Sequence, residues 1–289
     1  MSVERVIEPR LRDLGGFSVR RVLPFAKRRM VGPWIFFDHM GPTAFPAGQG
    51  IDVLPHPHIG LATVTCLFEG EILHRDSLGS QQLIRPGDIN LMLAGRGIAH
   101  SEREADAVRA RPHSLHGLQL WHALPVADEE TEPAFYHYPS VDLPKGRANG
   151  VDIRVLIGSA YGLASPVRTW SDTLYGEARM QAGQSLPTPP AAELALYLVS
   201  GAATMDGHRI AAQTMAVLAA NSRVMVRATA DSHLILIGGA PLGERFMEWN
   251  FVSSRKQRLT QASEDWRAGR FPKVVGDEEA FTPLPESRG

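Results

Sequence analysis

Short apolar segments recur along the chain, and their pattern predicts β-strands. Residues 61–68, with the sequence LATVTCLF, are almost all apolar or β-branched, which is typical of a buried strand. Tight turns such as Pro86-Gly87-Asp88 separate these segments, and no regular alternation of strands with helices is visible. The pattern therefore predicts an all-β protein made of β-sandwiches or barrels. The other predicted strands are residues 17–23, 72–76, 89–93, 115–121, 151–157, 174–180, 194–201 and 214–218.

Two stretches depart from the strand pattern. Residues 125–150 are rich in proline and acidic residues, and we expect an interdomain linker there. This divides the chain into an N-terminal domain over residues 1–130 and a C-terminal domain over residues 131–289. Residues 259–267 have a helical pattern with Thr260 as the predicted N-cap, and the remainder, residues 272–289, is expected to form a loose end.

The second half of the chain repeats the pattern of the first. Residues 194–201 resemble the strand that ends at Gly70, and residues 214–218 line up with residues 89–93. Only the first half of this duplication is expected to bind a metal, because the second half has no ligand set. The alignment places Pro187, Pro189, Met225 and Arg227 where the first half has His56, His58, His100 and Glu102.

Two pairs of potential metal ligands stand out in the first half, namely His56-Pro57-His58 and His100-Ser101-Glu102. Residues two apart on a β-strand point to the same face, so each pair can direct both side chains into one cavity. Three imidazoles and one carboxylate suit Fe, Zn, Ni, Cu or Mn, and they do not suit Ca or Mg. Spacing alone leaves open whether these residues are ligands or packed core residues.

Composition limits the compartment and the partners. The 289 residues include one cysteine, Cys66, so no internal disulfide is possible and a reducing compartment is indicated. There is neither a signal-peptide pattern nor an apolar run of about 18 residues, so we expect a cytoplasmic protein without a membrane span. The net charge of −1 argues against direct nucleic-acid binding.

Several motifs in the same order resemble the pirin family. They are FFDHMGP, HPHIG, TVTCLFEGEILHRDSLG, RPGDINLMLAGRGIAHSE, HGLQLWHALP and IGGAPLGE. The resemblance implies a bicupin, that is, two tandem jelly-roll cupin domains, here with a short C-terminal helix. It also implies one divalent metal in the N-terminal domain, with Fe(II) expected first and Zn, Ni, Cu or Mn as alternatives. The implied ligands are His56, His58, His100 and Glu102.

The resemblance also suggests an activity. Family members resemble quercetin 2,3-dioxygenases, which cleave a flavonol ring with O₂, so a small aromatic substrate is expected and Glu102 is the candidate general base. His74 and His116 could line the pocket as hydrogen-bond partners or proton carriers. The alternative is a redox- or iron-sensing regulatory cofactor that binds a protein partner without turnover. In either case we expect a monomer.

The chain departs from the family pattern after the HPH motif. Family members commonly have Arg and Glu where this sequence has Ile59 and Ala62. In pirins that glutamate lies close to the metal, and losing a carboxylate that supports a ligand typically costs about 10–100-fold in metal affinity or activity. The departure therefore predicts weaker metal binding with an unchanged ligand set.

Overall fold

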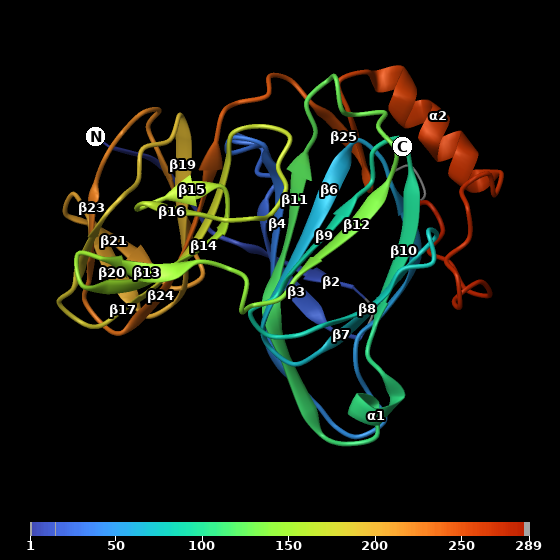
Figure 1. The fold of residues 1–289 in the computed structure, drawn as a ribbon, viewed down its shortest axis with the longest axis horizontal. Helices are drawn as coiled ribbons and strands as arrows, with labels where there is room; N and C mark the ends of the chain where they lie inside the picture. The colour runs from blue at the N-terminus through green and yellow to red at the C-terminus, as the bar shows by residue number, and fades with distance from the viewer. Residues whose placement is uncertain (1, 15, 286–289) are drawn as a thin grey trace. The chain divides into compact units, whose positions relative to one another are not determined.

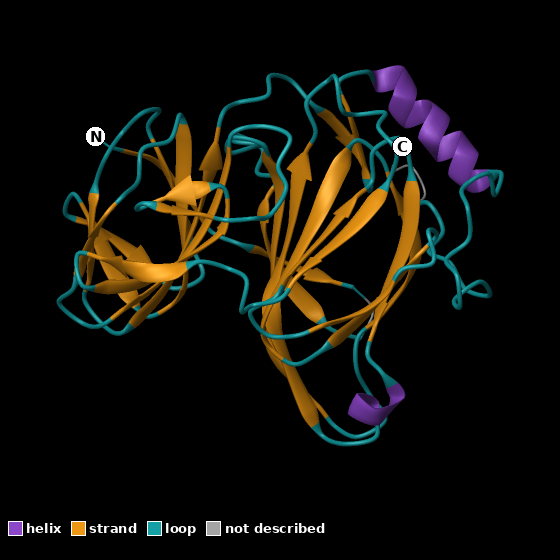
Figure 2. Cartoon of the chain, viewed as in Figure 1, coloured by secondary structure: helices purple, strands orange, loops and turns teal. Residues whose placement is uncertain are grey.

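The computed structural model describes residues 2–14 and 16–285, and strands dominate it (Figures 1 and 2). The described residues contain two helices, α1 (Asp106–Arg109) and α2 (Lys256–Arg267), of which α1 is a single turn. The all-β class predicted from the apolar pattern is therefore confirmed. No helix in the described part of the chain is long and apolar enough to cross a membrane.

The chain forms two compact units, each assembled from separate segments. Unit N comprises Leu11–Val19, Asp38–His137 and Leu242–Gly289, and unit C comprises Met1–Arg10, Arg20–Phe37 and Tyr138–Pro241. Both units therefore draw on early and late parts of the sequence. The predicted division into two domains, residues 1–130 and residues 131–289, remains a prediction.

Two sheets make up the sandwich of unit N. The smaller sheet has the order β5 (Asp52–His58), β10 (Ile98–Arg103), β7 (Ile72–Asp76) and β8 (Gln81–Ile84). The larger sheet has the order β12 (Ala134–Tyr138), β9 (Ile89–Leu93), β6 (Leu61–Glu69), β11 (His113–Ala123), β4 (Trp34–Phe45), β3 (Ser18–Leu23) and β2 (Arg10–Asp13). Strands β2, β3, β4 and β12 each extend beyond the segments of unit N. Strands β7 and β9 have the predicted bounds, because glycine turns mark their ends in the sequence.

Unit C has the same pair of sheet sizes. Its larger sheet has the order β1 (Val3–Ile7), β22 (Met215–Leu218), β19 (Glu193–Ser200), β24 (Ser232–Gly239), β17 (Thr173–Met180), β14 (Val151–Ile157) and β13 (Lys145–Ala148). Its smaller sheet has the order β18 (Ser185–Pro187), β23 (Met225–Ala228), β20 (Ala202–Met205) and β21 (His208–Ala211). A short hairpin of β15 (Ser159–Ala160) and β16 (Leu163–Ala164) forms a separate two-stranded sheet in unit C. A second one, of β25 (Phe246–Glu248) and β26 (Phe251–Ser253), belongs to unit N.

The internal duplication is visible in the strand register. In unit N, β5 pairs with β10 so that His56 lies opposite His100. In unit C, β18 pairs with β23 so that Pro187 lies opposite Met225, the two residues that the alignment placed at those positions. The second copy thus keeps the strand pair and replaces the two histidines.

The structure differs in detail from the predictions at three places. The stretch 125–150 contains the boundary between the two units, at residues 137 and 138, and it also contains strands β12 and β13, because its prolines lie outside the paired segments. Helix α2 begins at Lys256 with Arg255 as its N-cap, so the prediction of Thr260 as the N-cap is wrong and Thr260 lies inside the helix. Within the expected loose end, residues 272–285 have no regular secondary structure but make hydrogen bonds to strands β5, β7 and β10; residues 286–289 lie outside the described part.

Candidate metal centre

Strand pairing brings the two ligand pairs onto one face of the smaller sheet of unit N. His56 on β5 lies directly opposite His100 on β10, and directly opposed residues of antiparallel strands point to the same side. His58 lies two residues beyond His56 and shares its face. On the other edge of β10, Glu102 lies opposite His74 on β7. All five side chains are therefore directed to one side of this sheet.

A β-bulge separates the two ligands on β10 without turning them apart. The register with β5 shifts between His100 and Glu102. The register with β7 continues unbroken through the same residues, from His100 opposite Asp76 to Glu102 opposite His74. The bulge therefore offsets Glu102 along the edge next to β5 while the alternation of side chains is kept.

The three predicted histidine ligands form a compact cluster. Nε2 of His58 lies 3.1 Å from Nε2 of His100, and the His56 and His100 ring centroids are 4.3 Å apart. The potential ligand atoms of His56, His58 and His100 all lie within 4.8 Å of one another, and all three residues are buried. One ion could therefore reach all three rings.

A second group overlaps the first through His100. The potential ligand atoms of His74, His100 and Glu102 also lie within 4.8 Å of one another. His74 was expected to line the pocket, and it in fact lies directly beside the predicted ligands His100 and Glu102. Glu102 approaches the cluster from the side of His74 and His100.

Backbone carbonyls fix the proton on two of the rings. Nδ1 of His56 lies 2.8 Å from the carbonyl oxygen of Leu54, and Nδ1 of His58 lies 3.1 Å from that of Asn250. A carbonyl oxygen only accepts, so each Nδ1 carries the hydrogen. Burial lowers the pKa of His56 to about 4 and lowers that of His58 well below its ordinary value. At neutral pH both rings therefore present an unprotonated Nε2.

A chain of side-chain hydrogen bonds leads to the third ring. Nε2 of His74 lies 3.2 Å from Oδ2 of Asp76, and its Nδ1 lies 3.4 Å from Nδ1 of His100. With one proton on its ring, His74 donates from Nε2 to Asp76 and accepts from Nδ1–H of His100. His100 then presents an unprotonated Nε2 to His58. Burial of His100 lowers its pKa well below the ordinary value, which favours this neutral form.

Asp76 is held as the charged end of that chain. Burial alone would raise the pKa of Asp76, but hydrogen bonds from His74 and Ser80 outweigh it and lower the pKa. Oδ1 of Asp76 accepts from the backbone N–H groups of Leu78 and Ser80 at 2.9 and 3.0 Å. Asp76 was not predicted as a site residue, although its i+2 spacing from His74 on a predicted strand was a usable signal.

Glu102 is the one carboxylate among the predicted ligands. Burial raises the pKa of Glu102, while the nearby His74 and a hydrogen bond from Thr65 partly offset the increase. Oγ1 of Thr65 lies 3.2 Å from Oε1 of Glu102 and 2.7 Å from Oε1 of Gln119. Glu102 thus combines a raised pKa with a defined orientation.

The donor set fits a first-row transition metal. Three neutral Nε2 atoms directed at one another repel unless a cation lies among them, and imidazole nitrogens with a carboxylate suit Fe, Zn, Ni, Cu or Mn. Each ring is also oriented by an acceptor at its other nitrogen or by a further histidine, as is usual for metal-binding histidines. This observation supports a metal at His56, His58 and His100, with Glu102 alongside.

Aromatic side chains surround the cluster. The indole of Trp121 on β11 meets the His58 ring edge-on, with centroids 5.0 Å apart. Phe135 on β12 stacks on His74 at 4.4 Å. Both contacts come from the larger sheet, which faces the ligand strands and supplies an apolar wall.

His116 lies elsewhere in unit N. Its Nε2 is 2.8 Å from Nε2 of His39, and the two rings stack with centroids 5.0 Å apart. His116 lies opposite Glu69 at the end of β6, whereas Thr65, which contacts Glu102, lies opposite Gln119 further along β11. A role for His116 in the pocket stays a prediction without support from these contacts.

The two departures from the family pattern occupy apolar surroundings. Ile59 is 1% exposed and packs with Phe251, Leu259 and Ala262. Ala62 is buried on β6 opposite His122, three residues before Thr65 in a continuous register, so it points to the other face of the strand. The structure therefore places position 62 on the side of β6 away from Glu102, and the predicted loss of affinity through Ala62 has no support in this geometry.

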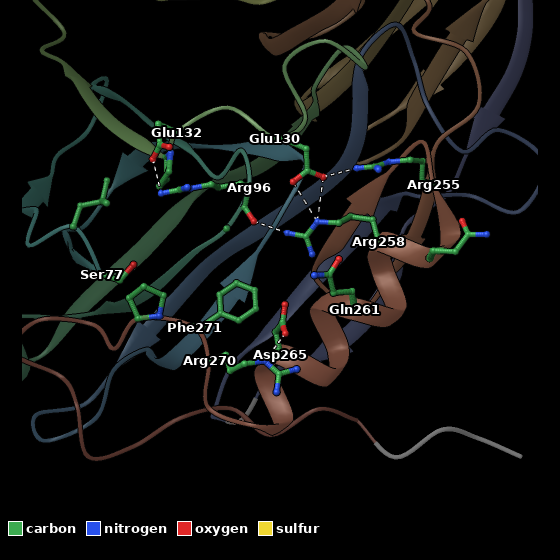
Figure 3. Close-up of a pocket in the computed structure, with 15 residues that line it drawn as sticks. Ser77, Arg96, Glu130, Glu132, Arg255, Arg258, Gln261, Asp265, Arg270 and Phe271 are labelled. Atoms are coloured by element: carbon green, nitrogen blue, oxygen red, sulfur yellow. Dashed lines mark hydrogen bonds and ion pairs between the residues drawn. The ribbon is translucent and has the colours of Figure 1, made fainter.

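A surface cavity of about 880 Å³ lies beside α2 and shares no residue with the histidine cluster (Figure 3). Its arginines are already paired with its carboxylates. Arg258 contacts Glu130 at 3.1 Å, Arg96 contacts Glu132 at 2.8 Å, and Arg270 contacts Asp265 at 2.6 Å. Among the described residues, the groups that could hold a metal are His56 with His58 and His100, and His100 with His74 and Glu102. None of these residues lines this cavity.

Comparison with known proteins identifies the family. The family described as Pirin matches residues 16–122, and the Pirin C-terminal cupin domain matches residues 175–272. A pirin-like protein of Caulobacter vibrioides is 44% identical over 288 residues, covering 98% of this chain and 100% of the relative. Rat pirin is 32% identical, and the alignment covers 87% of each chain.

Solved structures agree with that assignment. The crystal structure of quercetin 2,3-dioxygenase from Acinetobacter baumannii matches with a TM-score of 0.90 and 36% identity, covering 97% of this chain and 94% of that one. A bacterial pirin from Escherichia coli, in complex with nickel(II), has the same fold, with a TM-score of 0.64, 18% identity and coverage of 82% and 99%. The chain is therefore a member of the pirin family, with two cupin domains.

Proposed function

We propose that this chain binds one divalent transition metal, iron in particular, and cleaves a flavonol-like substrate with O₂ in the manner of a quercetin 2,3-dioxygenase. The observation that carries the proposal is the convergence of three buried Nε2 atoms whose opposite nitrogens are already engaged. The similarity to a solved quercetin 2,3-dioxygenase supports the choice of substrate class.

The proposed ligands are His56, His58, His100 and Glu102. A metal held there would supply a Lewis-acidic centre with one or two positions open to substrate and O₂. Leu54 and Asn250 hold the rings of His56 and His58 through their carbonyl oxygens. The side chains of this site are thus oriented before any ligand arrives.

Glu102 is the proposed proton acceptor. Its carboxylate lies in one group with His74 and His100, beside the proposed ligands, so Oε1 or Oε2 can take the proton of a flavonol hydroxyl bound there. Thr65 orients Oε1 by a 3.2 Å hydrogen bond. The rings of Trp121 and Phe135 provide apolar contacts for a planar aromatic substrate and keep water away from the reacting atoms.

The test is the consumption of quercetin in air by iron-loaded protein, followed through the flavonol absorbance. Glu102→Gln is expected to slow turnover at least about 100-fold, since general-base catalysis contributes about 10²–10⁴-fold. The matched control is His208→Ala, an exposed substitution in unit C, which should leave the rate unchanged. Full activity of a metal-loaded Glu102→Gln protein would contradict the role of Glu102. Metal binding without any quercetin consumption would contradict the dioxygenase activity and favour the regulatory alternative.

A further inference from the structure

The segment that follows α2 contacts the outer side of the strands that carry the proposed ligands. We define residues 274–284 as the C-terminal strap; in Figure 1 the red chain after α2 runs beside β10. We propose that this strap is a positioning element that holds β5, β7 and β10 so that the histidine cluster stays competent to bind metal. This inference rests on the metal site proposed above.

The strap contacts β5 at the residue that orients His56. Oγ1 of Thr282 lies 3.3 Å from the carbonyl oxygen of Leu54, the same oxygen that accepts from Nδ1 of His56. The backbone N–H of Thr282 donates to the carbonyl of Pro55 at 2.8 Å. Thr282 therefore fixes the two peptide groups immediately before His56.

The strap also contacts β7 and β10 beside site residues. The backbone N–H of Val275 donates to the carbonyl of Asp76 at 3.3 Å. Asp277 forms a two-pronged ion pair with Arg103, at 2.7 Å to Nε and 2.9 Å to Nη2. Arg103 directly follows Glu102 on β10. The strap thus holds each of the strands β5, β7 and β10 next to a residue that is a proposed metal ligand or that orients one.

Helix α2 anchors the far end of the strap. The indole Nε1 of Trp266 donates to the carbonyl oxygen of Thr282 at 2.9 Å. Trp266 and Leu284 pack against the apolar cluster that contains Ile59 and Phe251. Ile59 follows His58, and Asn250, whose carbonyl holds His58, precedes Phe251. The same C-terminal packing thus also supports the second histidine.

Polar contacts, rather than continuous packing, hold the strap over the strands. A cavity of about 520 Å³ remains between them, lined by Pro55, Ala99, Trp266, Phe271 and Phe281 among others. Because the strap bridges this space, removal of its hydrogen bonds should loosen it without opening the sandwich core. Removing these hydrogen bonds should change the geometry of the metal site and speed the release of the metal, with a smaller effect on the stability of the fold.

The test compares the full chain with the double variant Asp277→Ala/Thr282→Val. Each protein is loaded with Ni²⁺, and release into excess chelator is timed by elemental analysis. The double variant should release the ion about 10-fold faster, at the lower end of the effect of losing groups that support ligands. Co²⁺-loaded protein should show a changed ligand-field absorption spectrum, because the orientation of His56 changes.

The matched control is Asp265→Ala, which breaks the exposed ion pair with Arg270 next to the strap and leaves the strand contacts intact. It should release Ni²⁺ at the wild-type rate. Trp266→Phe keeps an aromatic ring but removes the bond to Thr282, and it should also accelerate release, which tests the strap if the double variant does not fold. A wild-type release rate and an unchanged Co²⁺ spectrum in the folded variants would overturn the positioning role alone. If the wild type held no Ni²⁺ or Co²⁺, the proposed metal site would fail, and the strap's role with it.

Discussion

At the scale of single residues, the i, i+2 pairs were the predictable part of the site. His56, His58 and His100 lie together because alternation along a strand is a local property that the sequence displays. The partners that orient the rings could not be predicted in the same way. Asn250 is 192 residues from His58 and contributes a backbone carbonyl, which leaves no signal in the residue type.

Ile59 illustrates why a family residue cannot simply be restored. Ile59→Arg would place a guanidinium among Phe251, Leu259 and Ala262, where the side chain is 1% exposed. An uncompensated buried charge costs about 3–5 kcal/mol, so we expect that loss of unfolding free energy in urea denaturation. Ile59→Leu, which keeps apolar volume, should cost less than about 1.5 kcal/mol. An arginine variant as stable as the wild type would show that the C-terminal cluster does not enclose this position.

At the scale of elements, strand existence was predictable and strand neighbours were not. The bounds of β7, β9 and β14 agree with the predicted ones, because apolar runs and glycine turns mark them locally. Pairing of β1 with β22 joins residues more than 200 positions apart, and no local pattern specifies it. The C-terminal strap was predicted to be loose for the same reason, since its contacts are made with distant strands.

The β25–β26 hairpin, whose turn contains Asn250, depends on a buried ion pair. Glu129 contacts Arg245 at 3.0 Å, both side chains are 3% exposed, and Glu129 also accepts from Ser253 and Ser254. Glu129→Ala would leave Arg245 buried without its counter-charge, which should cost about 3–5 kcal/mol in unfolding free energy. Because the turn supplies the carbonyl that holds His58, metal affinity should fall as well.

Glu130 provides the control for that hairpin. It neighbours Glu129, but its bridges to Arg255 and Arg258 involve a side chain that is 43% exposed. Glu130→Ala should cost less than about 1 kcal/mol, as is usual for exposed pairs. Equal costs for the two substitutions would mean that the buried pair does not anchor the hairpin.

At the scale of the whole molecule, the two copies of the sandwich share their strand pairing and differ in the side chains at the positions of the proposed metal site. Unit C keeps the strand pair β18–β23 but has Pro187 and Met225 where unit N has His56 and His100. Its buried titratable groups instead form a polar network around Glu177, which contacts the His233 ring at 2.8 Å and forms an ion pair with Arg154 at 3.1 Å. The duplication was visible in the sequence. The assembly of each unit from three separate segments of the chain was not, because it depends on contacts between residues far apart in the sequence.

That network predicts a pH dependence of stability. Burial would raise the pKa of Glu177, but His233, Arg154 and Arg179 outweigh it and lower the pKa to about 2 from an ordinary value of 4.5. A lowered acid pKa stabilises the fold above the ordinary value, and the contribution is lost as the pH falls towards 2. Glu177→Gln should therefore cost about 3 kcal/mol at pH 7, and its deficit should shrink between about pH 4.5 and 2.

The exposed pair Arg147–Asp152 in the same unit serves as the comparison. Both of its side chains are more than 60% exposed, so Asp152→Asn should change stability by less than about 1 kcal/mol at any pH. Denaturation curves of both variants across this pH range make the measurement. A deficit for Glu177→Gln that stayed constant down to pH 2 would contradict the lowered pKa.

The convergence of three histidines on one ion is tested most directly by elemental analysis. Wild type, His58→Ala and the control His208→Ala are purified without added metal, loaded with Fe²⁺ under anaerobic conditions and desalted. We predict about one metal ion per chain in the wild type and in His208→Ala, with most of it lost in His58→Ala, because the cluster then keeps two of its three imidazoles. Equal metal content in all three proteins would contradict the ligand assignment.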